Sequence, residues 1–225
     1  MQMKDLRPVS DLARRYGAKC IAYGPPGTGK TPLIQTAPRP VLCAVEPGML
    51  SMRNVRHVPA WEANTPERFA EFMDWLQRSP EARGFDTVGI DSISQTAEMF
   101  LVQELKRNKD GRKAFGEMHR RIMDHVNALY YMPNKHIYMI AKQTVGDDGM
   151  KKPYFPGQAL NADIPHLFDE ILHIDRVLIP GMNGGKPVQA IRTHGAYDAL
   201  ARDRSGNLAE LEPPDLGALF AKVMS

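Results

Sequence analysis

The stretch Gly24-Pro25-Pro26-Gly27-Thr28-Gly29-Lys30-Thr31 decides the fold of this 225-residue chain. It matches the spacing G-x-x-x-x-G-K-[ST], in which glycines let backbone N–H groups turn inward and surround phosphate oxygens. An apolar stretch, residues 19–23, precedes it, so we predict a strand before the loop and a helix after it. The N-terminus of that helix adds partial positive charge to the loop. The sequence therefore predicts a phosphate-binding site.

The motif also assigns roles to its last residues. Lys30 is expected to bridge the β- and γ-phosphates of a nucleotide, and the Thr31 hydroxyl to hold Mg²⁺. We therefore expect ATP and Mg²⁺ as cofactors, held by residues 24–32. Pro32 is unusual because it has no N–H to offer a phosphate, which should weaken nucleotide binding by about 0.5–1.5 kcal/mol.

Apolar stretches and amphipathic stretches alternate outward from this loop. We predict strands at 19–23, 40–45, 54–58, 87–90 and 136–141, and two amphipathic helices. Phe69, Phe72, Met73 and Leu76 mark the first of these, and Phe115, Met118, Ile122, Val126 and Leu129 the second. This alternation predicts an α/β fold with a mostly parallel sheet flanked by helices. Strands at 170–178 and 187–193 flank a glycine-rich turn and predict a β-hairpin extension in the C-terminal third. Residues 146–161 are expected to form a loop.

The composition fits one globular unit. The chain has 43% hydrophobic and 24% charged residues, a net charge of +3, and a length suited to one domain spanning 1–225. A short helical lead-in (1–17) and a C-terminal helix (212–225) would flank it. Without an apolar run of about 18 residues or a signal peptide, we expect a cytoplasmic protein with no membrane partner. Cys20 and Cys43 lie in apolar strands and are expected to be buried thiols.

Polar residues at predicted strand ends are candidates for catalysis, because the carboxyl ends of parallel strands meet at one edge of a sheet. Asp91 ends the strand at 87–90 and is expected to orient the metal; Asp86, which begins that strand, is the rival. Glu46 ends a neighbouring strand and could position the attacking water. Gln143 follows the strand at 136–141 and could sense the γ-phosphate. Each could instead be an ordinary polar residue at a strand or helix end.

Two P-loop families resemble parts of the chain. The sequence of the phosphate loop is similar to that of AAA+ ATPases. However, this chain has Asp91-Ser92 where those proteins usually have Asp-Glu, and its C-terminal third is β-rich. Residues 87–94 resemble the RecA-type recombinase core, as do Val45-Glu46 and the segment 140–143. Over about residues 8–210 the chain resembles phage-encoded RecA-like core ATPases of the single-strand annealing type.

The recombinase resemblance implies further residues and partners. Residues 188–194 are similar to a strand whose basic residues reach the neighbouring subunit's nucleotide; Arg192 matches the first basic position, His194 departs from the second, and Arg204 is another candidate. The resemblance implies a homo-oligomer with ATP at subunit interfaces, single-stranded DNA as ligand, and a single-strand-binding protein as a further partner. A phage origin would place the chain in the host cytoplasm.

Two segments are the expected DNA contacts. The first, residues 106–113, carries five basic side chains and one acidic, a net charge of +4: Lys106, Arg107, Lys109, Arg112 and Lys113. The second, residues 146–157, offers lysines for phosphates and rings for bases: Lys151, Lys152, Tyr154 and Phe155. The alternative to DNA binding is a solvated charged loop for the first segment and a mobile loop for the second.

These observations favour a Mg²⁺-dependent ATPase that binds single-stranded DNA and promotes annealing or pairing. Three other readings stay open: an AAA+-like helicase loader, an annealing module that uses nucleotide only as a switch, and a small-molecule kinase. A loader would bind a protein ring and lack affinity for single strands. A switch module would bind DNA with negligible turnover.

Overall fold

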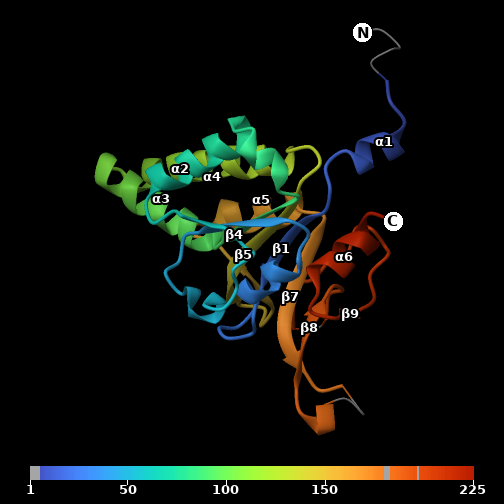
Figure 1. Ribbon diagram of the computed structural model, residues 1–225. Coiled ribbons are helices and arrows are strands. Elements are labelled where there is room, and N and C mark those ends of the chain that lie inside the picture. The colour runs from blue at the N-terminus through green and yellow to red at the C-terminus, as the bar shows by residue number, and fades with distance from the viewer. Residues whose placement is uncertain (1–5, 180–182, 197) are drawn as a thin grey trace.

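A computed structural model describes residues 6–179, 183–196 and 198–225 (Figure 1). These residues form one nine-stranded sheet, in the order β3-β2-β4-β5-β1-β7-β8-β9, with β6 paired to β5. The strands are β1 (Lys19–Tyr23), β2 (Pro40–Ala44), β3 (Ala60–Glu62), β4 (Thr87–Asp91), β5 (His136–Val145), β6 (Lys151–Tyr154), β7 (Glu170–Val177), β8 (Val188–Arg192) and β9 (Leu211–Glu212).

The helices begin at polar capping residues. Thr65, Ser92, Asp110 and Asp215 each accept a hydrogen bond from a backbone N–H of the first turn that follows. The α-helices are α1 (Val9–Arg14), α2 (Pro66–Arg78), α3 (Ile93–Arg107), α4 (Gly111–Tyr130), α5 (Gln158–Leu167) and α6 (Leu216–Val223). Short 3₁₀ helices are η2 (Thr31–Thr36), η3 (Met49–Met52), η4 (Glu81–Gly84) and η5 (Asn183–Gly185). Of these described helices, none is long and apolar enough to cross a membrane.

The strands from β3 to β7 in the sheet order run parallel, so their carboxyl ends share one edge. Strand β5 lies between β1 and β4, with Tyr23 opposite Ala141 and Asp91 opposite Ile140. Strands β7 and β8 are antiparallel, and β9 continues that pairing. The predicted α/β fold, with a mostly parallel sheet and a hairpin extension, is confirmed.

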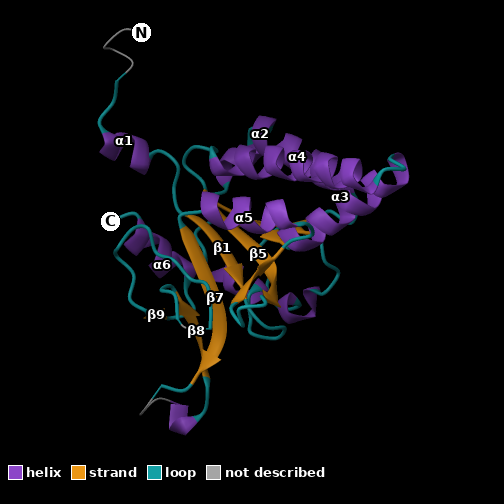
Figure 2. Cartoon of the chain, turned by 180° about the vertical axis from the view of Figure 1, so that it is seen from behind, coloured by secondary structure: helices purple, strands orange, loops and turns teal. Residues whose placement is uncertain are grey.

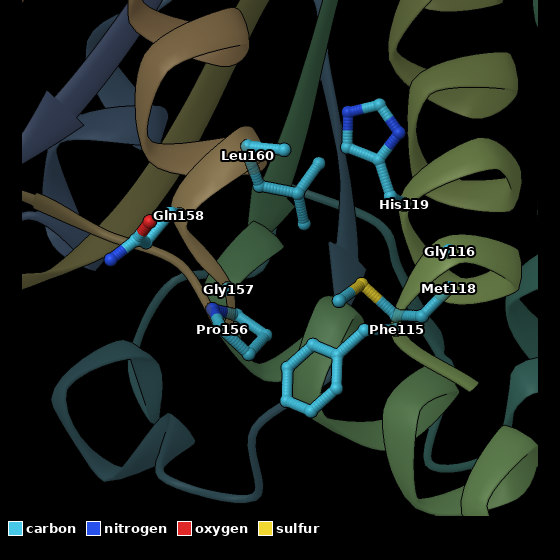
Figure 3. Close-up of a pocket in the computed structure, with 9 residues that line it drawn as sticks. Phe115, Gly116, Met118, His119, Pro156, Gly157, Gln158 and Leu160 are labelled. Atoms are coloured by element: carbon cyan, nitrogen blue, oxygen red, sulfur yellow. The ribbon is translucent and has the colours of Figure 1, made fainter. Parts of the chain in front are cut away.

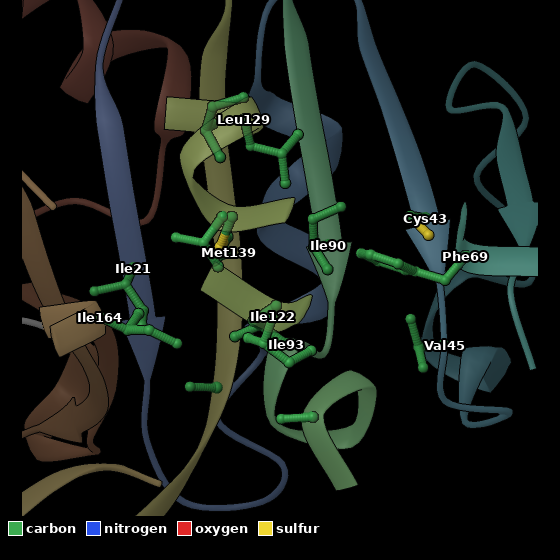
Figure 4. Packing of buried hydrophobic residues seen from close by; sticks show 14 of the residues in the cluster. Ile21, Cys43, Val45, Phe69, Ile90, Ile93, Ile122, Leu129, Met139 and Ile164 are labelled. Atoms are coloured by element: carbon green, nitrogen blue, oxygen red, sulfur yellow. The ribbon is translucent and has the colours of Figure 1, made fainter. Parts of the chain in front are cut away.

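Two apolar cores cover the two faces of the sheet (Figures 1 and 2). On one face, helices α2 to α5 pack on β1, β2, β4 and β5. Figure 4 shows Phe69 beside Cys43, Ile122 beside Met139 and Ile164 beside Ile21. On the other face, η2 and α6 supply Leu33, Ile34, Leu216, Leu219 and Phe220. Strands β1, β2 and β4 are buried at every position, which follows from having a core on each side.

Three local predictions were wrong. The helix after the phosphate loop is only η2, because Ala37 precedes Pro38 and a residue before proline disfavours the helical conformation. Residues 54–58 form no strand; Arg56 and His57 are exposed there, and the edge strand is β3. Residues 146–161 contain a strand and the start of a helix, because β5 continues to Val145 and turns back at Gly149 into β6.

Candidate active site

The phosphate loop leaves the sheet at the end of β1, between two strands that continue past it. At Gly24, an added Cβ would lie 2.0 Å from the carbonyl oxygen of Ile174. At Gly29, the backbone has a φ of +86° and an added Cβ would lie 2.6 Å from Nε2 of Gln189. Only glycine fits these two positions, because β7 and β8 pack directly against the loop.

Lys30 lies over this loop. Its Nζ donates to the carbonyl oxygens of Gly24 and Pro25, each at 2.8 Å. Burial lowers the pKa of Lys30, while the nearby charges of Asp91 and Glu46 raise it. The lysine therefore shares one small space with both carboxylates.

Asp91 lies where the sequence predicts, at the carboxyl end of β4. Its Oδ2 accepts a hydrogen bond of 2.5 Å from the Thr31 hydroxyl. Burial, and then the charge of Glu46, raise the pKa of Asp91, whereas the Thr31 hydrogen bond and Lys30 lower it. The rival Asp86 is at the other end of this strand, where it pairs with Arg39 at 2.5 Å. The alternative assignment to Asp86 is therefore wrong.

Glu46 follows β2 and lies beside Asp91. The backbone N–H groups of Val45 and Glu46 both donate to the Asp91 carbonyl, at 2.7 and 3.1 Å. The Ser92 hydroxyl donates to Glu46 Oε1 at 2.5 Å. The structure thus brings Lys30, Thr31, Glu46 and Asp91 together from three chain segments, and adds Ser92 as the group that orients Glu46.

Gln143 lies inside β5, two residues before its end, and not at the end of a strand as predicted. Its Oε1 is 3.1 Å from Nε2 of His173 on β7, and the His173 ring lies 4.9 Å from the ring of Tyr23. Burial lowers the pKa of His173. Gln143 and His173 therefore bridge β5 and β7 just beyond the end of β1, next to the phosphate loop.

The two arginines expected to act on a neighbouring nucleotide lie far apart. Arg192 is opposite His173 in the sheet, at the phosphate-loop edge, and pairs with Glu210 at 2.8 Å. Arg204 pairs with Asp169 at 3.3 Å, just before β7 begins beside the start of β1. Arg204 therefore lies at the opposite edge of the sheet, away from the phosphate loop of its own chain, and its action on a neighbouring subunit's nucleotide stays a prediction.

The first DNA segment is not a free loop, because Lys106 and Arg107 end α3 and Arg112 and Lys113 lie in the first turn of α4. Only residues 108–110 connect these helices. The five basic side chains remain exposed. We call residues 106–113 the basic turn.

The second DNA segment differs more from its prediction. Phe155 is 1% exposed and packs in the core, so its assignment as a ring that stacks on bases is wrong. Tyr154 is half-buried on β6. Lys151 pairs with Asp198 at 2.7 Å and Lys152 with Asp148 at 3.3 Å. These partly exposed pairs are weak, so both lysines can exchange partners at small cost.

The site fits a magnesium nucleotide. The glycines leave the loop open to phosphate oxygens, and at Gly27 no atom lies within 4 Å of an added Cβ. In the described ranges, no group of three or more His, Cys, Asp or Glu side chains converges as a metal cage. Thr31 and Asp91 alone suit Mg²⁺, which is commonly held by one or two protein oxygens together with substrate phosphates.

Three contributors were missed by the sequence reasoning. Gln189 Nε2 donates to the Gly29 carbonyl at 3.3 Å, and Ser92 and His173 contact the two assigned side chains Glu46 and Gln143. Ser92 could have been found from its place beside Asp91. Gln189 and His173 carry no local signal, because their strands only meet the loop through the folded sheet.

Comparison with known families then identifies the chain. Residues 16–205 match a family model described as an AAA domain. The chain belongs to this AAA-domain family. With its complete phosphate motif, it is a P-loop NTPase domain. The match agrees with the similarity of the phosphate-loop sequence to that of AAA+ ATPases.

Among solved structures, one similar fold is the KaiC-like protein PH0186 from the hyperthermophilic archaeon Pyrococcus horikoshii OT3. The two chains are 13% identical, align with a TM-score of 0.45, and cover 79% of this chain and 78% of that one. A search of curated proteins found no match to the sequence.

Proposed function

We propose that this protein is a Mg²⁺-dependent ATPase that binds single-stranded DNA and promotes strand annealing or pairing. The observation that carries the ATPase half is the 2.5 Å contact between Thr31 and Asp91, with Lys30 and Glu46 in the same space. A hydroxyl, a carboxylate, a lysine and a second carboxylate are the groups that phosphoryl transfer to water requires.

Each group has a separate task in hydrolysis. Lys30 would stabilise negative charge on the β- and γ-phosphates, and Thr31 and Asp91 would hold Mg²⁺, which would supply further positive charge to the phosphates. Glu46 accepts a proton from the attacking water as the new P–O bond forms and the bond to ADP breaks. Ser92 holds Glu46 in place through its hydrogen bond.

The DNA half of the proposal rests on charge. Within the described residues, four side chains of the basic turn form no ion pair: Lys106, Lys109, Arg112 and Lys113. Only Arg107 is paired, with Glu104 at 3.2 Å. Unpaired and exposed cations are free to contact phosphates, and such contacts make binding strongly salt-dependent.

A short chain of hydrogen bonds links the two halves. Ser94, in the first turn of α3 after Asp91, donates to the Tyr154 carbonyl on β6 at 2.6 Å. Its Oγ also accepts from the backbone N–H of Lys142 on β5 at 2.9 Å. Through these contacts, a shift of Asp91 and Ser92 on nucleotide binding would move the β5–β6 hairpin that carries the second DNA segment.

We extend the proposal to a homo-oligomer with ATP at subunit interfaces, assisted by a single-strand-binding protein. Arg192 supports the first part, because it lies near the sheet's outer end at the phosphate-loop edge. Its partner Glu210 is 70% exposed, so the arginine can be released to a neighbouring subunit's nucleotide.

A helicase loader is the second candidate function, and the match to the AAA-domain family favours it. A loader would bind a protein ring and show no affinity of its own for single strands. Capture of a replicative helicase in a defined two-protein mixture, without DNA binding, would replace the annealing proposal.

Charge reversal tests the annealing proposal. The double variant Lys109→Glu/Arg112→Glu should weaken binding to a labelled oligonucleotide and slow annealing of two complementary strands, because two phosphate contacts become repulsive. The control Arg78→Glu/Arg83→Glu reverses two exposed charges at the far end of α2 and in η4. Equal losses in both variants, or no loss in either, would contradict the assignment of the basic turn.

A further inference from the structure

An apolar pocket lies beside the basic turn, between α4 and the segment that leads into α5 (Figure 3). It has a volume of about 400 Å³ and is lined by residues that include Phe115, Gly116, Met118, Pro156, Gly157 and Leu160. The periodicity of α4 predicts Phe115 in the core, but its side chain is 41% exposed at the pocket. A large ring left at the surface, beside other apolar groups, indicates a binding site.

The walls of this pocket are held in place by polar contacts. Asn161 Nδ2 donates to the carbonyls of Phe155 and Gly157, each at 2.8 Å, and fixes the segment around Pro156. His119 on α4 contacts Asp163 on α5 at 2.8 Å and ties the two helices together. The pocket is therefore formed before any ligand arrives, which lowers the entropic cost of binding.

The pocket and the basic turn lie on one continuous strip of α4. Arg112 is three residues before Phe115, so the two share a face of the helix and are roughly 4.5 Å apart along its axis. Lys113 is likewise three residues before Gly116, so these two residues also neighbour each other on the helix surface. Cations beside an apolar slot with one exposed ring match the chemistry of single-stranded nucleic acid, whose phosphates alternate with flat bases.

We propose that this pocket takes one unstacked base of single-stranded DNA, which stacks on Phe115 while its flanking phosphates contact Arg112 and Lys113. This inference rests on the proposed DNA-binding function and names the site that reads the base. Phe155 is buried and cannot stack on a base, so Phe115 takes the role that the sequence predicted for Phe155. Double-stranded DNA would not enter it, because its bases remain paired and stacked.

The chain offers a direct way to block the pocket. Gly116 lines the pocket and an added Cβ there meets no atom within 4 Å, so Gly116→Leu adds apolar bulk at the pocket wall without a clash. Gly84 in η4 also has open space around an added Cβ, so Gly84→Leu is a matched control away from the pocket. Phe115→Ala removes the ring, and Phe115→Tyr keeps it.

The test compares affinity for an oligothymidylate and for an abasic strand of the same length by fluorescence anisotropy. We expect the wild type, Gly84→Leu and Phe115→Tyr to prefer the base-bearing strand by at least about fivefold, as expected for stacking of one base. Gly116→Leu and Phe115→Ala should lose this preference and still bind the abasic strand in a salt-dependent way.

Two other outcomes overturn the inference in different ways. Equal wild-type affinity for both strands, or an unchanged preference in Gly116→Leu, would show that the pocket does not bind a base. DNA binding by the basic turn would still stand. An apolar peptide would then be the occupant of the pocket. No binding of either strand would overturn the proposed function together with the inference.

Discussion

Single side chains in the nucleotide site have environments that match their proposed tasks. Asp91 is buried with its Oδ2 on the Thr31 hydroxyl, while Glu46 is only half-buried and is held by Ser92. The buried carboxylate suits a fixed role on the metal. The more open carboxylate can reach a water molecule beside the γ-phosphate. In the proposed mechanism, Asp91 therefore holds the metal and Glu46 accepts the proton of water.

Substitution of these residues should separate binding from turnover. Glu46→Gln should keep nucleotide affinity and lower ATP turnover by about 10²–10⁴-fold, because the amide cannot accept the proton of water. Lys30→Ala should lower both, with a loss of about 10²–10³-fold in turnover. Fluorescent-nucleotide titration and phosphate release measure the two quantities. ATP turnover that is retained in Glu46→Gln would contradict the assignment of Glu46 as the general base.

Pro32 is the second residue of η2 and lacks the N–H that most residues could offer a phosphate. Pro32→Thr should tighten nucleotide binding by about two- to tenfold, the equivalent of one recovered hydrogen bond. Isothermal titration with a non-hydrolysable ATP analogue measures the change. An unchanged affinity would show that no phosphate oxygen lies near this position.

The elements connect the proposed nucleotide site to the proposed DNA-binding surface. Strand β4 ends at Asp91, α3 begins two residues later at Ile93, and the first turn of α3 holds β5 and β6 through Ser94. These contacts are short and partly buried, and they join residues that are 48 and 60 positions apart in the sequence. Nucleotide state can therefore be transmitted as a movement of whole elements.

Removal of this link should uncouple the two sites. Ser94→Ala should bind nucleotide and DNA but show a smaller ratio of DNA-stimulated to basal ATP turnover. Thr96→Val is the control, because it removes another buried hydroxyl of α3 that bonds only to the Ser92 carbonyl. A full stimulation ratio in Ser94→Ala, or an equal loss in the control, would argue against this route.

The start of β7 should make stability depend on pH. Glu170 is fully buried; burial first, and then the nearby charge of Asp203, raise its pKa to about 8 from an ordinary value of 4.5. Between these values folded Glu170 keeps a proton that the unfolded chain releases, so stability should fall as pH rises from about 5 to 8.

Glu170→Gln tests this dependence, because glutamine cannot titrate. Urea unfolding at pH 5.5 and pH 8 should show a smaller difference in midpoint for the variant than for the wild type. An identical difference in both proteins would mean that other groups control the pH dependence.

Much of this architecture is visible in the sequence. The phosphate motif, the apolar strands and the spacing of Phe69, Phe72, Met73 and Leu76 depend on local geometry, which the chain encodes directly. Asp91 and Glu46 were found because parallel strands end at one edge. Strand β6 was missed because Gly146 and Gly149 make its turn resemble a loop, and Pro153 is tolerated only because β6 is an edge strand.

What the sequence does not reveal depends on contacts between distant segments. Phe115 fits the periodic pattern of α4, yet it lies at the surface because Pro156 and Gly157 leave a slot beside it. Phe155 looks like an exposed loop aromatic, yet the β5–β6 hairpin turns it inward. Arg204 is near Arg192 in sequence, but the two lie at opposite edges of the sheet.

The whole molecule places its charge unevenly. Its net charge is +3, whereas the basic turn alone carries +4, so the remainder of the chain is close to neutral. Such a distribution concentrates attraction for phosphates at the tip of α3 and α4, next to the apolar pocket. The proposed nucleotide site lies at the phosphate-loop edge of the sheet, and α3 and β6 connect the two.

We propose that nucleotide hydrolysis and single-strand binding are coupled in this one chain. ATP turnover with Mg²⁺, measured with and without single-stranded DNA at low and high salt, tests it most directly. Coupling of the two activities predicts strong stimulation of ATP turnover by single strands at low salt and loss of this stimulation at high salt. Turnover that is indifferent to DNA at every salt concentration would contradict the claim and favour a protein partner.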